Sequence, residues 1–194
     1  MKMGKSKLIN KLEEYIHLTD SEEELIKSVF KTKSYRANEH IHWAQGESAY
    51  FIYVVSGLVH AYHVEDGIHT TTNVVPEDHF ISPYLSFLIK EPSREYIQCL
   101  ENCEILTLTR SKMDDLYKTV REWEKLGRIF AQYNFELMAE RVLPKIKTDK
   151  ERFLGYFEIT PRSIFERVPT EVLSSFLEIH EDELIRLIDR YDVD

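Results

Sequence analysis

The sequence predicts an α+β protein in which a double-stranded β-helix, or jelly roll, is followed by one long helix and a small helical domain. Residues 50–108 carry short runs of β-branched and aromatic residues with glycines between them, which is typical of an antiparallel barrel or jelly roll. The apolar spacing then becomes helical, and residues 169–194 have the spacing of a helix-turn-helix. We therefore expect domains at 1–120, 121–146 and 147–194.

Two short helices are expected to open the chain, at residues 7–17 and 22–30, and Asp20 or Ser21 can cap the second. Glu65, Asp66 and Gly67 lie between two strand-like runs and predict a tight turn. The clearest expected strands cover residues 50–55, 58–64, 68–75, 95–100 and 104–108.

The longest expected helix covers about residues 121–143 and carries an apolar seam of about two heptads. We predict that this seam is the interface of a homodimer, because it is longer and more aromatic than a cap over a barrel requires. The alternative is that it packs on the β domain of its own chain. The seam residues are Trp123, Leu126, Phe130, Tyr133 and Leu137. Pro144 then ends or kinks the helix, and residues 145–150 form a polar hinge.

The formal net charge of −9 argues against a general attraction to nucleic acid or anionic membranes. The excess is concentrated in residues 169–194, which contain eight acidic side chains and two arginines. No run of about 18 apolar residues occurs, so we expect no membrane span and a cytoplasmic protein. Cys99 and Cys103 match no paired zinc motif and are expected to be buried structural thiols, with a redox pair as the alternative.

Several short segments carry a family resemblance. The predicted barrel contains Gln45-Gly46-Glu47, Tyr50-Phe51-Ile52 and Ser56-Gly57-Leu58-Val59, and the C-terminal part contains Glu151-Arg152-Phe153-Leu154, Arg167-Val168-Pro169 and Ser175-Phe176-Leu177. Together they resemble the cyclic-nucleotide-binding barrel and the approach to the DNA-binding helices in the Crp/Fnr family of bacterial transcription regulators. The resemblance covers nearly the whole chain. It implies a sensor barrel, a dimerisation helix and a helix-turn-helix that binds DNA.

The phosphate cassette of that family uses glycines, a Gly-Glu pair and an arginine to hold the cyclic nucleotide. Here Ser82-Pro83 stands where Gly-Glu belongs, Ser93 stands where the arginine belongs, and Arg94 lies one residue further along. No glycine occurs between residues 68 and 126, so backbone amides approach a phosphate less readily. We therefore expect no cyclic nucleotide and no other cofactor.

The barrel can still hold a different effector, and an aromatic, hydroxyl-rich pocket with one arginine suits a small organic anion. The alternative is a filled barrel that serves only as a scaffold. The candidate lining residues are Ser82, Tyr84, Ser86, Ser93, Arg94 and Tyr96.

Four histidines raise the possibility of a metal site. His40 and His42 alternate onto one face of an expected strand, and His60 and His63 lie on a nearby strand. His60 and His63 point to opposite faces of a regular strand, so no more than three of the four can converge. We expect no metal. Without a metal triad or a nucleophile–base pair, we also expect no enzymatic activity.

The last expected helix would read DNA, and its outward stripe is Asp182, Ile185, Arg186 and Asp189. Arg186 matches an arginine that is common in the family and is the predicted contact to guanine, with a surface ion pair to Asp182 or Asp189 as the alternative. Glu178 occupies the glycine position of the family's turn. The candidates for phosphate contacts are Arg162, Arg167, Arg190, Lys147 and Lys150.

Two functions follow as hypotheses. The first is a homodimeric Crp/Fnr-like transcription regulator with no cyclic nucleotide in its sensor and with DNA contacts weakened by the acidic reading helix. The second is a family member whose acidic helix-turn-helix serves as a protein-interaction module for a basic partner. A small-molecule effector is compatible with both.

Overall fold

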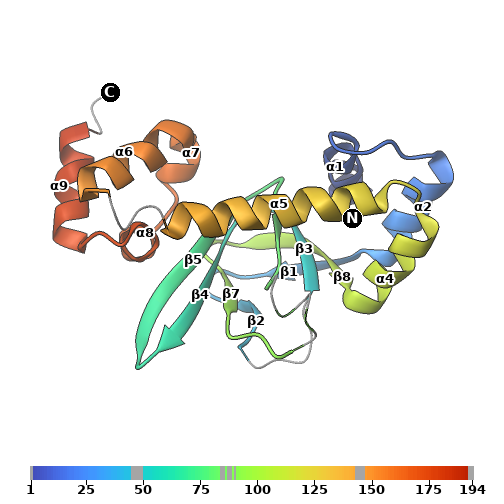
Figure 1. Cartoon of the computed structure of the whole chain (residues 1–194), viewed down its shortest axis with the longest axis horizontal. Helices are drawn as coiled ribbons and strands as arrows, with labels where there is room; N and C mark the ends of the chain where they lie inside the picture. Colours follow the sequence, from blue (N-terminus) through green and yellow to red (C-terminus); the bar gives the residue numbers. More distant parts are fainter. Residues whose placement is uncertain are drawn as a thin grey trace.

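The computed structural model describes residues 2–44, 50–83, 86, 89, 91–142 and 147–191. Within these residues two four-stranded antiparallel sheets form a sandwich: sheet 1, in the order β1-β8-β3-β6, and sheet 2, in the order β2-β7-β4-β5 (Figure 1). This arrangement confirms the predicted jelly-roll-like domain. The strands are β1 (Lys31–Tyr35), β2 (His40–His42), β3 (Tyr50–Ser56), β4 (Leu58–Glu65), β5 (Ile68–Pro76), β6 (Phe80–Ile81), β7 (Tyr96–Cys99) and β8 (Cys103–Thr109).

Aliphatic side chains fill the space between the two sheets. Alternate residues of a strand point to opposite faces, so one residue in two points inward. Ile52 and Val54 of β3, Ile97 of β7 and Ile105 of β8 are fully buried in this interior cluster. The described part of the barrel interior is therefore a packed hydrophobic core.

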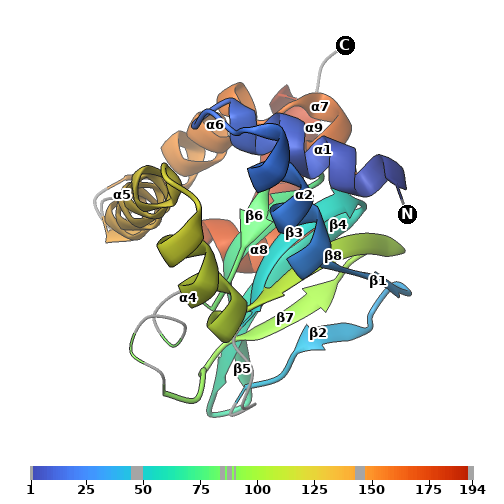
Figure 2. The ribbon, with the colours of Figure 1, turned by 90° about the vertical axis from the view of Figure 1, so that its right-hand side faces the viewer.

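The N-terminal helices and α4 cover the outer face of sheet 1, and α6 to α9 form a separate group at the other end of the molecule (Figures 1 and 2). The long helix α5 leaves this cover and reaches the C-terminal helices at the other end of the sandwich (Figure 1). The helices are α1 (Lys2–Glu13), α2 (Asp20–Val29), α4 (Arg110–Thr119), α5 (Trp123–Val142), α6 (Asp149–Ile159), α7 (Arg162–Phe165), α8 (Thr170–Leu177) and α9 (Glu181–Tyr191).

The N-terminal helices begin earlier than expected, at Lys2 and Asp20. Thr19 is the N-cap of α2, not Asp20 or Ser21. Its side chain accepts a hydrogen bond from the backbone of Glu22, whose carboxylate in turn accepts from the backbone of Thr19. This reciprocal pair is a capping box and satisfies two backbone donors.

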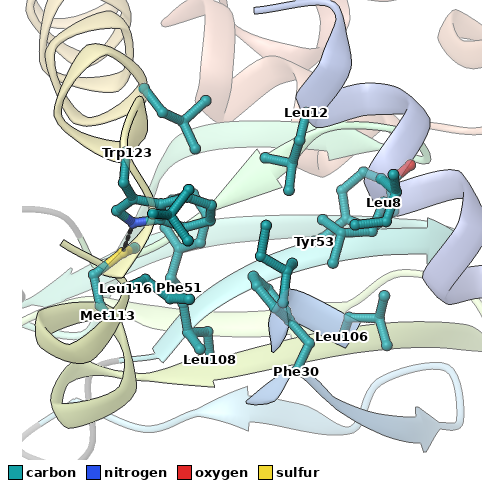
Figure 3. Packing of buried hydrophobic residues seen from close by; sticks show 14 of the residues in the cluster. Leu8, Leu12, Phe30, Phe51, Tyr53, Leu106, Leu108, Met113, Leu116 and Trp123 are labelled. Atoms are coloured by element: carbon teal, nitrogen blue, oxygen red, sulfur yellow. Dashed lines mark hydrogen bonds between the residues drawn. The ribbon is translucent and has the colours of Figure 1, made fainter. Parts of the chain in front are cut away.

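A second hydrophobic core lies between these helices and sheet 1, and Figure 3 shows its side chains. Leu8 and Leu12 of α1 and Phe51 of β3 belong to this cluster. Trp123, the first residue of α5, is also inside it, and its indole N–H donates to the Sδ atom of Met113 over 2.9 Å (Figure 3). The start of α5 is thereby fixed on the β domain.

This packing corrects the predicted dimer seam at two positions. The side chains of Trp123 and Leu126 are only 1% exposed in the single chain, because they complete the core under α5, and they are not accessible to a second chain. Phe130 also faces the β domain, with its ring centroid 4.9 Å from that of Phe51. Tyr133 is 42% exposed, and the side chain of Leu137 lies outside the described residues. The first half of the seam thus follows the alternative, packing on its own β domain.

The predicted tight turn between β4 and β5 is confirmed. β4 ends at Glu65 and β5 begins at Ile68, so the loop has two residues. Both Asp66 (φ 51°) and Gly67 (φ 80°) have positive φ. This backbone conformation matches the twist of the flanking strands and favours Asp-Gly.

The C-terminal helices α6 to α9 pack around a third core, in which Phe153, Leu173 and Leu184 are almost fully buried. Leu58 of β4 belongs to the same cluster, and Val74 of β5 packs against it. The C-terminal unit therefore shares its core with the outer face of sheet 2, where Figure 1 shows α8 beside β5.

Candidate functional site

The turn between α8 and α9 has the geometry of a compact helix pair. Glu178 ends α8 in the left-handed region (φ 55°, ψ 41°), where glycine is normally favoured. The backbone carbonyl of Glu178 accepts a hydrogen bond from Arg152 over 2.9 Å. Ile179 is buried, and its carbonyl accepts from the hydroxyl of Ser174. The following helix, α9, is therefore held at a defined angle to α8.

The outward stripe of α9 is exposed as expected. Ile185 is 44% exposed, and the side chain of Arg186 is 76% exposed. Arg186 pairs with Glu183 at 3.3 Å; the sequence had suggested Asp182 or Asp189 as its partner. Because such an exposed pair contributes little, Arg186 can exchange this partner for another acceptor at small cost.

Arg167 is engaged inside the chain. Its guanidinium donates two hydrogen bonds to the carboxylate of Glu77 (2.9 and 3.0 Å) and two to that of Glu101 (2.9 and 2.8 Å). These hydrogen bonds lower the pKa of Glu77 from its usual value. Glu77 follows β5 and Glu101 lies between β7 and β8, so the contact joins the C-terminal unit to the sandwich. Arg167 thus joins the two parts of the chain in this structure, and its contact with phosphate stays a prediction.

The other basic candidates lie on the C-terminal unit. The guanidinium of Arg162 pairs with Glu166 at 2.8 Å, and the ammonium of Lys150 lies 5.3 Å from the ring centroid of Tyr191. Arg190 and Lys147 are exposed, Arg190 in the last turn of α9. These four cations stay candidates for phosphate contacts.

The predicted pocket residues that the structure describes do not meet at one place. The hydroxyl of Ser86 donates to the carbonyl of Pro83, and that of Ser93 accepts from the backbone of Glu95. Arg94 is exposed. Tyr84 lies outside the described residues. Local hydrogen bonds thus engage two of the hydroxyl groups that were expected to bind an effector.

Tyr96 points away from the barrel interior, because its neighbour Ile97 points inward. On the outer face of sheet 2 its ring stacks on Tyr62, with centroids 5.1 Å apart, and Tyr62 accepts or donates a hydrogen bond at 2.8 Å with His40. Tyr96 is therefore part of an aromatic surface and does not line a pocket inside the barrel.

The histidines are also placed differently from the expectation. A bulge in β2 pairs His40 with Gln98 and His42 with Ile97, so the two histidines point to opposite faces of sheet 2. His60 lies on the outer face, where its Nε2 is 3.0 Å from the side-chain oxygen of Gln98. Burial lowers the pKa of His60. Among the described residues no group of three or more metal-ligating side chains is present.

The two cysteines are free, buried thiols, as the sequence predicted. The thiol of Cys103 lies 3.5 Å from the carbonyl of Leu58 and 3.3 Å from that of Glu101. The hydrogen bond with Cys103, together with burial, raises the pKa of Cys99. Both groups act as small core side chains at the end of the sandwich.

A cavity of about 270 Å³, which no pattern in the sequence predicts, lies between α1, β6 and α5. Ser82 is the one predicted pocket residue among the described side chains that line it. The cavity lies at the edge of sheet 1: Phe51 and Phe80 in its wall face the helices, and Ile81 belongs to the core between the sheets. No motif marks such a site, since its walls come from four separate segments of the sequence, at 11–15, 51, 73–82 and 129–136. The aromatic lining residues are Tyr15, Phe51, Phe80, Phe130 and Tyr133.

Comparisons with known proteins find a family match for the sandwich and a shared fold for the longer chain. Residues 32–120 match the family model of the cyclic nucleotide-binding domain. No curated protein sequence matches the chain. None of the described helices is both long and apolar enough to cross a membrane.

Solved structures match over most of the chain at low identity. FixK2 from Bradyrhizobium japonicum has a TM-score of 0.72 at 17% identity, over 84% of this chain and 85% of its own. CLP from Xanthomonas campestris, a c-di-GMP-responsive global regulator, has a TM-score of 0.68 at 12% identity, over 90% and 92%. A protein from Eubacterium rectale assigned to the Crp/Fnr family has a TM-score of 0.61 at 17% identity, over 90% and 84%. Residues 32–120 are thus similar to the cyclic nucleotide-binding domain family, and the chain as a whole has the fold of these solved structures.

Proposed function

We propose that the protein is a homodimeric DNA-binding transcription regulator of the Crp/Fnr type whose sensor domain does not bind cyclic nucleotides. The observation that carries this proposal is the extent of the fold match. A match over 90% of the chain is too long to be confined to the sandwich and α5, so it includes C-terminal helices. The solved proteins of this fold named above are regulators, which favours a regulatory role over an enzymatic one.

We infer that α8 and α9 form the helix-turn-helix, with α9 as the reading helix. In this motif the second helix enters the major groove and its N-terminal residues contact base edges. Ile185 and Arg186 are exposed on α9. Leu184 and Leu187 form the buried side of this helix, so Arg186 points away from the core. Arg186 is the proposed contact to guanine, because guanidinium groups bind the O6 and N7 atoms of that base.

We infer that the protein binds the phosphate backbone of DNA weakly, because few basic side chains are available for it. Arg167 is bound to Glu77 and Glu101, so it contributes no phosphate contact while the C-terminal unit stays on the sandwich. Arg190, Lys147, Lys150 and Arg162 remain on the C-terminal unit, where the acidic first turn of α9 opposes them. Each phosphate that a protein neutralises adds about 0.9 to the slope of affinity against salt on logarithmic axes. A small slope is therefore expected.

We infer that the second half of α5 supplies the dimer contact. Phe135 is 71% exposed in the single chain. Tyr133, at 42%, is two residues away on a different face of α5, towards the cavity. An exposed aromatic side chain on a long helix favours pairing with a second copy, in which the same face of both helices meets across a two-fold axis. Such a dimer would present two copies of α9, as a two-fold symmetric DNA site requires.

The absence of cyclic nucleotide binding rests on the cassette and on the core. Ser82 replaces the cassette glycine, and the aliphatic side chains between the sheets leave the described interior filled. A phosphate placed there would lose its water without backbone amides to replace it. Addition of cyclic AMP or cyclic GMP is expected to leave the melting temperature unchanged, since a ligand stabilises only a protein that binds it.

The second candidate function is an interaction module for a basic protein. It is favoured by one observation: Glu181 and Asp182 are exposed beside Ile185, and the single arginine among them already pairs with Glu183. A basic partner with an apolar residue would complement this surface better than a polyanion does.

Titration of a labelled mixed-sequence duplex with the full chain, at several salt concentrations, separates these functions. The regulator is expected to bind the duplex at low salt, with an affinity that falls as salt rises. The same titration with an Arg190→Glu variant is expected to show weaker binding and a smaller slope. No binding by the folded dimer at low salt would contradict the proposed regulator and favour the interaction module.

A further inference from the structure

We propose that the cavity between α1, β6 and α5 binds a small, uncharged molecule with a flat apolar body and one hydrogen-bonding group. This inference goes beyond the proposed function and does not depend on DNA binding. The cavity volume of about 270 Å³ lies near the lower end of the range of ligand pockets. Because an apolar cavity of about 150 Å³ accommodates benzene, the volume suits a molecule of one or two rings.

The apolar part of the site is a cluster of three phenylalanines. Phe51 of β3, Phe80 of β6 and Phe130 of α5 are in mutual contact, with ring centroids 4.9–5.0 Å apart. Phe51 is buried and the other two are partly buried, so the cluster is held by its own packing. Rigid aromatic walls of this kind favour a flat apolar ligand that stacks or packs edge-on.

The polar part of the site is the hydroxyl of Ser82. Its Oγ atom is buried and has no hydrogen-bond partner among the described residues. A buried hydroxyl left without a partner costs roughly 1–3 kcal/mol, and buried polar groups normally have one, either protein or another molecule. A ligand with one donor or acceptor would supply it.

The charges at the cavity wall favour a neutral ligand. The ammonium of Lys11 pairs with Glu14 at 2.7 Å and lies 5.8 Å from the ring centroid of Tyr15. The carboxylate of Glu136 accepts a hydrogen bond from Gln132 at 2.9 Å. One cation and one anion, each with a partner in the chain, give no net attraction to a charged molecule.

The site lies at the edge of sheet 1, where β6 is the last strand. Phe51 and Phe80 in its wall pack against the cluster under the helices, and Ile81 in the same wall belongs to the core between the sheets. A ligand in the cavity would touch α1, the sheet and α5 together. Its binding would stabilise the position of α5 on the β domain, and α5 is the element that joins the sensor to the C-terminal unit.

Indole and benzoate are suitable probes for the full chain, because both are flat and only benzoate carries a charge. Indole is expected to raise the melting temperature and to bind at least tenfold more tightly than benzoate in calorimetric titration. Ser82→Leu and Asn134→Leu fill the cavity from opposite walls and should each weaken indole binding at least tenfold. Ala131→Leu adds the same bulk on the exposed side of α5 and should leave indole binding unchanged.

Absence of indole binding to the folded wild-type chain would overturn the proposal, and so would undiminished binding to both filled variants. If the filled variants do not fold, Ile129→Ala provides the test, because it enlarges the cavity without adding bulk. This variant is expected to bind 2-naphthol more tightly than the wild type does. Equal affinity of both chains for 2-naphthol would contradict the assignment. None of these readouts involves DNA, so they stand apart from the test of the regulator.

Discussion

The guanidinium of Arg167 holds the carboxylate of Glu77 through two hydrogen bonds of 2.9 and 3.0 Å, across the boundary between the C-terminal unit and the sandwich. Glu101 completes the contact on the other side of the same guanidinium. Further along β5 from Glu77, the backbone N–H of Thr71 donates to the hydroxyl of Ser175 in α8 over 2.8 Å. Polar contacts therefore fix α8 on sheet 2 in addition to the shared apolar core.

Replacing Arg167 by Gln is expected to loosen this docking. Its partners are about one third exposed, so solvent screening limits the loss to about 1 kcal/mol of unfolding free energy. Hydrogen exchange should show faster exchange at α8 and at the end of β5, with sheet 1 unaffected. Arg162→Gln removes the exposed pair between Arg162 of α7 and Glu166 at its C-terminal end, and is the matched control; equal effects of both variants would contradict the interdomain role.

The docking is also expected to depend on pH. Because Arg167 lowers the pKa of Glu77 in the folded state, the carboxylate stabilises the folded chain above its usual pKa of 4.5, and this contribution is lost as the pH falls through the lower folded value. The melting temperature of the wild type should therefore fall more steeply below pH 4.5 than that of Glu77→Gln. Parallel curves for the two proteins would show that Glu77 is not linked to stability.

Glu178 carries backbone strain that glycine would remove. A non-glycine residue in the left-handed region destabilises the folded chain by about 1–2 kcal/mol. Glycine removes this strain, but it also increases the entropy of the unfolded chain, so the net gain is smaller. Glu178→Gly is expected to raise the free energy of unfolding by about 0.5–1 kcal/mol. In denaturant titration Glu181→Gly, three residues away in helical backbone, should instead lower it. Destabilisation by both changes would argue against strain at Glu178.

Two positions on α5 should respond in opposite ways to a charge. Leu126→Asp places a carboxylate in the core under α5 and is expected to unfold the domain, since an unpaired buried charge costs several kcal/mol. Phe135→Asp changes an exposed side chain and should give a folded monomer. Circular dichroism and mass in solution distinguish these results. If Leu126→Asp gave a folded monomer, Leu126 would belong to the dimer interface after all.

Five of the strands and the turn between β4 and β5 were predictable because their signals are local. Asp66-Gly67 is a typical two-residue hairpin loop, and a run of β-branched and aromatic residues marks β3. The surface against which α5 packs was not predictable from the sequence. The apolar spacing of Trp123 and Leu126 is equally compatible with packing on a sheet and with pairing of two helices. The segments 45–49 and 143–146, which include Gly46 and Pro144, lie outside the described residues.

The sites were less predictable because they depend on distant contacts. The sequence around Arg167 suggests a basic surface residue, because its partners Glu77 and Glu101 lie 90 and 66 positions away. The bulge that separates His40 from His42 leaves no mark in the residue types. The exposure of Arg186 on α9, by contrast, followed from helical periodicity alone and is confirmed.

The most direct test of the proposed regulator is selection of bound fragments from a random duplex library at low salt, with the wild type and Arg186→Ala in parallel. We predict that the wild type enriches a two-fold symmetric site and that Arg186→Ala loses the preference at one base pair in each half-site, while keeping its fold and its dimeric mass. A folded wild-type dimer that enriches no sequence, or an Arg186→Ala variant that enriches the same site unchanged, would contradict the role of α9 as a reading helix.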